Sequence, residues 1–230
     1  GSGFGSTVSI RASAMLPNAK RRLRLVISDE EDSLRPGFLE ATGAALQPAT
    51  SAAIRWRPEF FRKIKYTFDI GLRSTPDIYA RVRAIRQWQV GEDTVLRFSD
   101  IARYGAQEKH RNVIRLETEH VLNHKTVFQQ SNVVQYWEKE PEPVGLRWEQ
   151  DWIILHRLGL QKSVSYGLLM QGVQRPAWQM DSKSLFLQYR QTVWRPWLFL
   201  DVEPHLTRYR SKAWETLPSL ILRLEAQFGK

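Results

Sequence analysis

Charged residues at alternate positions are the feature of this sequence with the most evident chemistry. Arginine, aspartate and glutamate recur two residues apart in the stretches RLETE, RWEQD, LDVE and RLEAQ. Residues two apart on a β-strand point to the same face, so each stretch places charges along one face of a strand. We therefore expect cross-strand ion pairs between neighbouring strands.

The basic and acidic members of these faces fall in different parts of the chain. If the faces surround a lumen, the earlier strands form a basic wall and the later strands an acidic wall, with an electric field across the lumen. The predicted basic wall comprises Arg73, Arg81, Arg83, Arg97, Arg103 and Arg115. The predicted acidic wall comprises Glu117, Glu119, Glu149, Asp151, Asp201, Glu203 and Glu225.

Histidine is the other residue type that could carry catalysis or hold a metal ion. His120 and His124 could share a face, but no serine in a hydrolase-type context lies near them in the sequence. Histidines in loops or at a membrane boundary, and carboxylates in ion pairs, account for these residues without an active site. The chain also has no cysteine, which excludes disulfides, thiol catalysis, Fe–S clusters and cysteine-based zinc sites. We predict no catalytic residues, no metal site and no cofactor.

The elements that must position the charges are β-strands. From Arg62 onward, apolar residues recur with a period of two, and the helical period is hardly sustained anywhere. The pattern predicts an all-β chain with strands of about ten residues, longer than most strands in soluble sheets. The expected strands are 6–16, 20–29, 50–57, 62–75, 77–90, 94–104, 111–122, 126–137, 145–157, 161–173, 182–194, 197–208 and 217–229.

Strand length and loop length together favour an antiparallel transmembrane β-barrel. A strand tilted across a bilayer needs about 9–11 residues, and outer-membrane barrels alternate short periplasmic turns with longer outside loops. Here short links alternate with longer polar ones, for example 123–126 and then 138–143, and a link at 106–111 is also expected to be long. We predict one barrel domain over 6–230, a long outside loop at about 29–50, and a cloning remnant or flexible start at 1–5.

Aromatic residues support the membrane interpretation. Rings with a polar tip favour the boundary between lipid and water, and several tryptophans fall at or beyond predicted strand ends. The predicted membrane girdle comprises Trp88, Trp137, Trp194, Trp197 and Trp214. Phe228 is the predicted aromatic of the barrel-insertion signal, although Gly229 and Lys230 follow it.

The net charge of +10 also requires a test for nucleic-acid binding. The basic run at 20–25, KRRLRL, alternates with leucines and contains no aromatic residue, whereas single-stranded nucleic acid is bound by basic grooves with aromatic platforms. No Gly-rich phosphate loop or dinucleotide-binding motif is present. We predict no nucleic-acid partner and interpret the run as cations near anionic headgroups.

Alternation alone does not decide which face is inside. In a soluble barrel or sandwich the apolar row faces a core and the charged row faces water, and the sequence pattern is the same. A soluble β fold therefore remains the main alternative.

Three segments resemble motifs in an uncharacterised family of Gram-negative outer-membrane β-barrel proteins: QSNVVQYW, WRPWLFLDVEPHLT and LILRLEAQFG. The resemblance extends over most of the chain and implies a barrel in the outer membrane of a Gram-negative bacterium. It also implies one further strand upstream of the first residue, and it implies no activity.

Strand number is left open between 12 and 14. Thirteen segments are counted, whereas bacterial single-chain barrels almost always have an even number of strands. The segment 50–57 could be misjudged, which gives 12 strands. Otherwise a first strand is missing upstream or is supplied by a separate chain, which gives 14.

Two functions compete for such a barrel. The first is a narrow, porin-like channel or transporter for small solutes, anions included, attracted by the basic wall. The second is a non-conducting scaffold whose lumen is sealed by Arg/Glu pairs and which binds a partner protein or a separate strand. The channel is favoured by fold analogy alone. In both cases the expected partners are membrane lipid, lipopolysaccharide and the barrel-assembly machinery.

Overall fold

The computed structural model describes residues 11–15, 23–29, 50–58, 63–73, 77–107, 109–139 and 145–226. For 11–15, 23–29, 50–51, 73 and 226 it describes the backbone alone. Residues 1–5, most of the predicted loop at 29–50, and Phe228 lie outside the described residues, so the predictions for them stay predictions.

Strands account for nearly all of the described chain, as the two-residue period predicts. They are β1 Arg11–Met15, β2 Leu23–Asp29, β3 Thr50–Trp56, β4 Ile64–Arg73, β5 Ile78–Val90, β6 Thr94–Gly105, β7 Lys109–Asn123, β8 Thr126–Trp137, β9 Leu146–Gly159, β10 Lys162–Val173, β11 Gln179–Thr192, β12 Leu198–Tyr209 and β13 Thr216–Ala226, with a short 3₁₀ helix η1 at Arg210–Lys212. No helix among the described residues is long and apolar enough to cross a membrane. The all-β prediction is confirmed.

The strands follow one another in the sheet in chain order, and each register that is defined is antiparallel. Only eleven strands, β3 to β13, have described side chains, whereas β1 and β2 are described by backbone alone. The count of thirteen wall strands is therefore not supported. Within the described residues no pairing joins the first strand to the last, so closure into a barrel stays a prediction.

One predicted link is wrong. The sequence pattern places a long link at 106–111, but β7 already begins at Lys109, so the link is shorter. Residues 109–112 read KHRN, a polar run without apolar alternation. Backbone pairing does not need apolar side chains, so the strand continues where its sequence pattern has stopped.

The chain divides into two compact units, each described here by itself: Gly1–Ile85 with Ile101–Arg111, and Arg86–Asp100 with Asn112–Lys230. In the first unit the polar face of the strands is buried and the apolar face is exposed. Asp69 is 2% exposed and Arg81 7%, whereas the apolar neighbours Ile70 and Ile78 are each 66% exposed.

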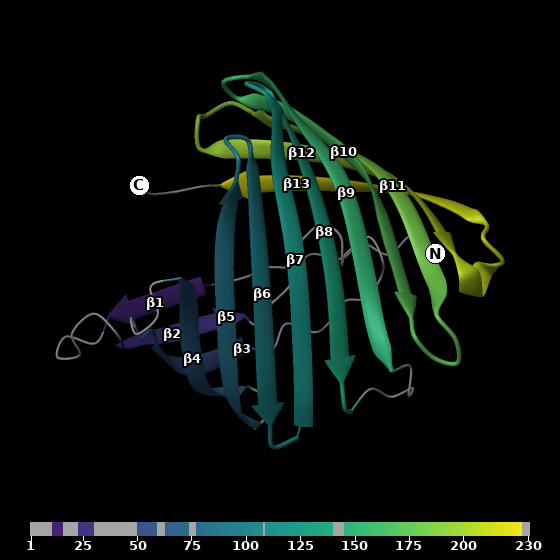
Figure 1. Cartoon of the computed structure of the whole chain (residues 1–230). Coiled ribbons are helices and arrows are strands. Elements are labelled where there is room, and N and C mark those ends of the chain that lie inside the picture. Colours follow the sequence, from purple (N-terminus) through teal and green to yellow (C-terminus); the bar gives the residue numbers. More distant parts are fainter. Residues whose placement is uncertain are drawn as a thin grey trace. The chain divides into compact units, whose positions relative to one another are not determined.

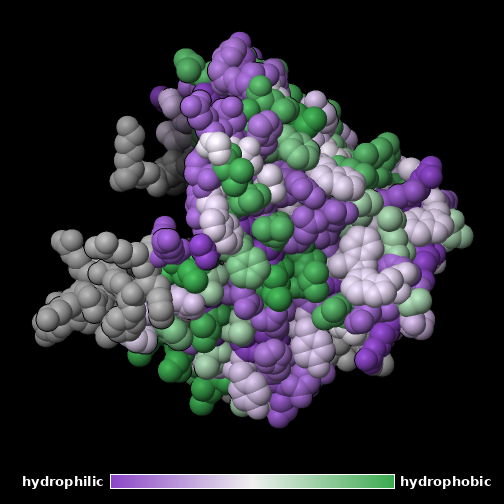
Figure 2. Space-filling model, in the orientation of Figure 1, coloured by the Kyte–Doolittle hydropathy of each residue, from purple (hydrophilic) through white to green (hydrophobic). Residues whose placement is uncertain are grey.

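The second unit has the same polarity, with strands β8 to β13 side by side (Figure 1). On β12, Asp201 is 1% exposed and His205 2%, whereas Leu206 is 52% exposed and Leu222 on β13 is 65%. Figure 2 shows that hydrophobic side chains reach the surface in many places on the face seen there.

This polarity is the reverse of that expected for a soluble fold, in which the charged row faces water. Burial of charge beside exposed leucine and isoleucine fits strands with one face toward lipid and the other toward a polar interior. The arrangement thus favours the membrane interpretation over the soluble one.

Candidate functional site

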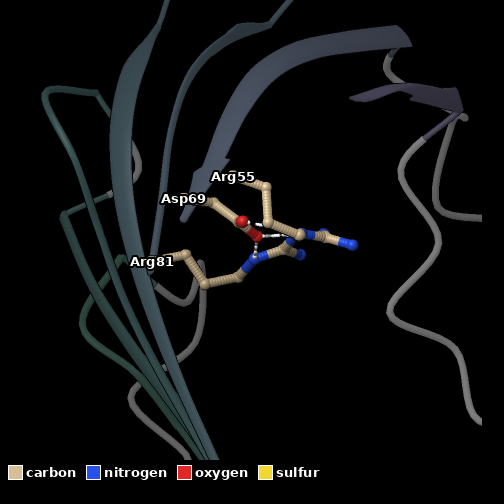
Figure 3. A network of polar contacts seen from close by, with 3 residues as sticks. All are labelled: Arg55, Asp69 and Arg81. Carbon is tan, nitrogen blue, oxygen red and sulfur yellow. Dashed lines mark hydrogen bonds and ion pairs between the residues drawn. The ribbon is translucent and has the colours of Figure 1, made fainter. Parts of the chain in front are cut away.

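A buried ion-pair cluster joins three adjacent strands of the first unit, and we call Arg55, Asp69 and Arg81 the arginine-rich cluster (Figure 3). Arg55 donates from Nε to Oδ1 of Asp69 at 2.8 Å and from Nη2 to Oδ2 at 3.0 Å. Arg81 donates to Oδ2 from Nε at 2.9 Å and from Nη2 at 2.5 Å. One carboxylate is thus shared by two guanidinium groups.

The register of the strands produces this geometry. Arg55 on β3 lies directly opposite Asp69 on β4, which allows a bidentate pair. Arg81 comes from the polar face of β5 and is almost fully buried. The three side chains together carry one net positive charge, held in a place where water is largely excluded.

An aromatic ring and a further arginine extend the polar face of this unit. Tyr79 is 2% exposed, and the guanidinium carbon of Arg103 lies 4.1 Å from the centre of its ring. Gly71 provides the space for Tyr79, because a Cβ at Gly71 would lie 2.9 Å from the ring's Cζ atom and 2.6 Å from the backbone oxygen of Ala52. The arginine-rich cluster therefore has additional positive charge on the same unit.

The second unit contains a cluster of the opposite composition, Arg190, Asp201 and Glu225, which we call the carboxylate-rich cluster. Arg190 donates to Oδ2 of Asp201 at 3.1 Å and to Oε2 of Glu225 at 2.7 Å. Its guanidinium also lies 4.5 Å from the ring centre of Phe199. Arg223 is in register with Asp201 on β13 and adds positive charge beside the cluster.

Next to these residues lies a buried hydrogen-bonded set on β11 and β12. His205 Nε2 is 2.8 Å from Oε1 of Glu203, and His205 Nδ1 is 3.5 Å from Oγ of Ser184. Ser184 Oγ is also 2.8 Å from Oγ1 of Thr207. These are the residue types of a hydrolase triad, but Ser184 is only 4% exposed and its hydroxyl has Thr207 as a closer partner. The set therefore satisfies buried polar groups rather than presenting a nucleophile.

The arginines of the predicted basic wall differ in exposure. Arg81, Arg103 and Arg115 are buried, and Arg83 is half-buried. Arg97 is exposed and lies 3.5 Å from Glu117, which is also 3.9 Å from Arg115. The side chain of Arg73 lies outside the described residues.

The predicted acidic wall is divided between buried and more exposed positions. Asp151, Asp201 and Glu203 are buried, and Glu119 is exposed. The other three are half-buried: Glu117, Glu149 and Glu225. Glu149 accepts a hydrogen bond from Nε2 of Gln171 at 3.0 Å, so it is held by an amide as well as by its neighbours.

The predicted girdle tryptophans all lie at strand ends or in links. Trp88 lies near the end of β5 and Trp137 ends β8. Trp194, 86% exposed, and Trp197, 38% exposed, lie between β11 and β12, and Trp214 lies between β12 and β13. Their role at a membrane boundary stays a prediction.

Several residues that make up the two clusters are absent from the predicted walls. Arg55 belongs to the weakest predicted segment, 50–57. Asp69 is an acidic residue in the part of the chain whose polar faces are predicted to be mainly basic. Alternation does place Asp69 and His205 on polar faces, but only the cross-strand register reveals their partners. No described residues form a group of three or more His, Cys, Asp or Glu suited to a metal ion, and the absence of a metal site stays a prediction.

No family model matches the chain, and no curated protein matches it. Among solved structures, the "KdgM porin" is 7% identical at a TM-score of 0.46, covering 79% of this chain and 94% of that one. The "NanC porin" is 8% identical at a TM-score of 0.47, covering 78% and 94%. A "Bacterial polysaccharide outer membrane secretin" is 10% identical at a TM-score of 0.51, covering 88% of this chain and 72% of that one. The last likeness shows the fold, an all-β antiparallel sheet of the kind found in outer-membrane barrels.

Proposed function

We propose that the protein is an outer-membrane β-barrel channel for small solutes, whose arginine-rich cluster favours anions. The apolar face of the strands contacts lipid, and the polar face lines a narrow lumen. On this proposal the short links face the periplasm. Lipopolysaccharide and the barrel-assembly machinery are the expected partners, and a further strand, upstream or from a separate chain, completes the barrel.

The observation that carries the proposal is the buried cluster on the polar face in which two arginines bind one carboxylate. Two guanidinium groups share the single carboxylate of Asp69, which is 2% exposed. Positive charge in a poorly hydrated wall acts over a longer range than positive charge in water, because it is less screened. A solute passing along this wall therefore meets a field that attracts anions.

Conductance of the purified protein in a planar bilayer tests the proposal, with the reversal potential measured under a salt gradient. We expect anion-selective steps. Arg81→Gln removes one positive charge and lowers the anion-to-cation permeability ratio by about twofold, whereas Asp69→Asn removes one negative charge and raises the ratio. The opposite signs matter, because a general loosening of the barrel would move both variants in the same direction.

Glu225→Gln is the matched control in the second unit, since it removes a charge from the carboxylate-rich cluster and leaves the arginine-rich cluster intact. Cation-selective steps that do not respond to Arg81→Gln would contradict the proposal.

A sealed scaffold is the second candidate, supported by the number of buried ion pairs on the polar face. Protein that inserts into the bilayer but stays silent, in the wild type and in Arg81→Gln alike, would favour it. The next step would then be a search for a partner of the loops or of a separate strand.

A further inference from the structure

Two threonine–histidine pairs with the same geometry lie at one end of the second unit. Oγ1 of Thr94 is 2.8 Å from Nδ1 of His120, and Oγ1 of Thr126 is 2.8 Å from Nδ1 of His156. Each threonine is the first residue of its strand, β6 or β8. Each histidine lies three residues before the end of the neighbouring strand, β7 or β9. The same device thus occurs twice, beside the short links of the sheet.

Both histidines lie on the apolar face of their strands. Strand alternation places His156 opposite the buried Asp151 and Ile153, and places His120 opposite the buried Arg115. The apolar residues near them are exposed: Leu122 at 52%, Leu158 at 52% and Leu160 at 102%. The two imidazoles are half-buried and sit where an apolar surface gives way to the polar turns.

Each threonine hydroxyl engages Nδ1 of its histidine, so Nε2 is the ring nitrogen that can meet a ligand. A threonine hydroxyl that donates to Nδ1 leaves the ring proton of a neutral imidazole on Nε2. Within the described part of the chain, Nε2 of neither histidine takes part in a hydrogen bond. In the tautomer in which the threonine hydroxyl donates to Nδ1, each pair presents an N–H donor at Nε2 beside an exposed apolar surface.

Positive charge and aromatic rings surround this end of the unit. Lys125, Arg157 and Lys162 are exposed in or beside the short links. The guanidinium of Arg86 lies 4.7 Å from the ring centre of Trp88, and that of Arg195 lies 5.7 Å from the ring centre of Trp194. N–H donors, cations and amphipathic rings above an apolar band are complementary to an anionic headgroup above acyl chains.

We propose that His120 and His156 each bind the phosphate group of a membrane phospholipid, with Nε2 donating and the nearby lysines and arginines supplying positive charge. The exposed leucines contact the acyl chains. Thr94 and Thr126 are positioning residues that fix the ring proton. The proposal rests on the proposed function only in that the apolar face contacts a membrane; it does not require an open lumen.

Native mass spectrometry of the detergent-purified protein tests the proposal, with dioleoylphosphatidylglycerol added and with dioleoylglycerol, which lacks the phosphate, in parallel. We expect the His120→Asn/His156→Asn double variant to bind the phospholipid about tenfold more weakly than the wild type, because charge-assisted hydrogen bonds are lost. Dioleoylglycerol should bind both proteins equally. His124→Asn, an exposed turn histidine at the same end, is the control and should bind like the wild type.

A second variant, Thr94→Val/Thr126→Val, keeps both imidazoles and frees the ring proton, so we expect it to weaken phospholipid binding by a smaller factor. The heat-dependent electrophoretic shift typical of barrels shows whether each variant is folded.

Equal phospholipid binding by the folded wild type and the folded His120→Asn/His156→Asn variant would overturn the proposal. So would a wild type that binds lipid A and not phosphatidylglycerol, since the ligand would then come from lipopolysaccharide. Failure of the channel would appear separately, as silent protein in the bilayer.

Discussion

The two ion-pair clusters have opposite compositions, and they differ in exposure. In the arginine-rich cluster two guanidiniums share one carboxylate, and the side chains of Arg55, Asp69 and Arg81 are 18%, 2% and 8% exposed. In the carboxylate-rich cluster one guanidinium joins two carboxylates, and the side chains of Arg190, Asp201 and Glu225 are 29%, 1% and 38% exposed. The carboxylate that the two guanidiniums of the first cluster share is almost fully buried, whereas two members of the second cluster are partly exposed to water and Arg223 lies in register beside it.

Both units pack an aromatic ring against a glycine on the polar face. Gly71 in the first unit leaves room for the ring of Tyr79, and Gly167 in the second leaves room for Phe186, whose Cε1 atom would lie 3.0 Å from an added Cβ. In the second unit the glycine and the aromatic are cross-strand partners. An aromatic ring that covers a glycine fills the polar face in both units, so packing there does not depend on the charges alone.

The largest effect is expected from Asp69→Ala. It removes the buried carboxylate that both Arg55 and Arg81 bind, and breaking a buried pair in this way costs about 3–5 kcal/mol. The free energy of unfolding, measured by urea titration of protein folded into lipid vesicles, checks the value. Glu225→Ala, the matched change in the carboxylate-rich cluster, should cost about 1 kcal/mol or less, because Arg190 keeps Asp201. Equal losses of unfolding free energy in the two variants would show that the difference in solvent exposure between the clusters does not affect stability.

Much of the fold could be predicted from the sequence. Each strand has one apolar face and one polar face, so apolar and polar residues alternate along it with a period of two. The strands β4 to β6 and β8 to β12 begin and end close to the predicted limits. What the period could not settle was the polarity of the two faces, since a soluble sheet has the same pattern. Burial settles it, with Asp201 at 1% exposed and Leu222 at 65%.

The site was predicted less well, because a period says which face a residue occupies and nothing about its partner. Arg81, Arg103 and Asp201 were expected on the polar face and are buried there. Arg55 was missed, because its strand is short and the first four residues of TSAAIRW are small, which gives a weak alternation. The partner of Asp69 follows from the register of β3 against β4, which depends on the connection between them.

An intermediate effect is expected from Gly71→Ala. The added Cβ would lie 2.8 Å from Cβ of Ala53 as well as close to the Tyr79 ring, so neighbouring atoms must move. Overpacking of this kind typically costs about 1–3 kcal/mol. Gly159→Ala is the control, because nothing lies within 4 Å of its added Cβ. Thermal unfolding of both variants in detergent, followed by circular dichroism, should show a lower midpoint for Gly71→Ala alone. An unchanged midpoint would mean that Tyr79 is not held against Gly71.

The smallest effect is expected from Arg97→Ala, a residue of the predicted basic wall that lies outside both clusters. Its side chain is 47% exposed and its contact with Glu117 is long, at 3.5 Å. Exposed ion pairs contribute about 0–1 kcal/mol, because water screens the attraction and ordering two long side chains costs entropy. The urea titration used for Asp69→Ala should therefore give nearly the wild-type free energy of unfolding. If the free energy of unfolding fell nearly as much as in Asp69→Ala, Arg97 would have to be shielded from water in the membrane. Ion pairs outside the two clusters would then also stabilise the polar face.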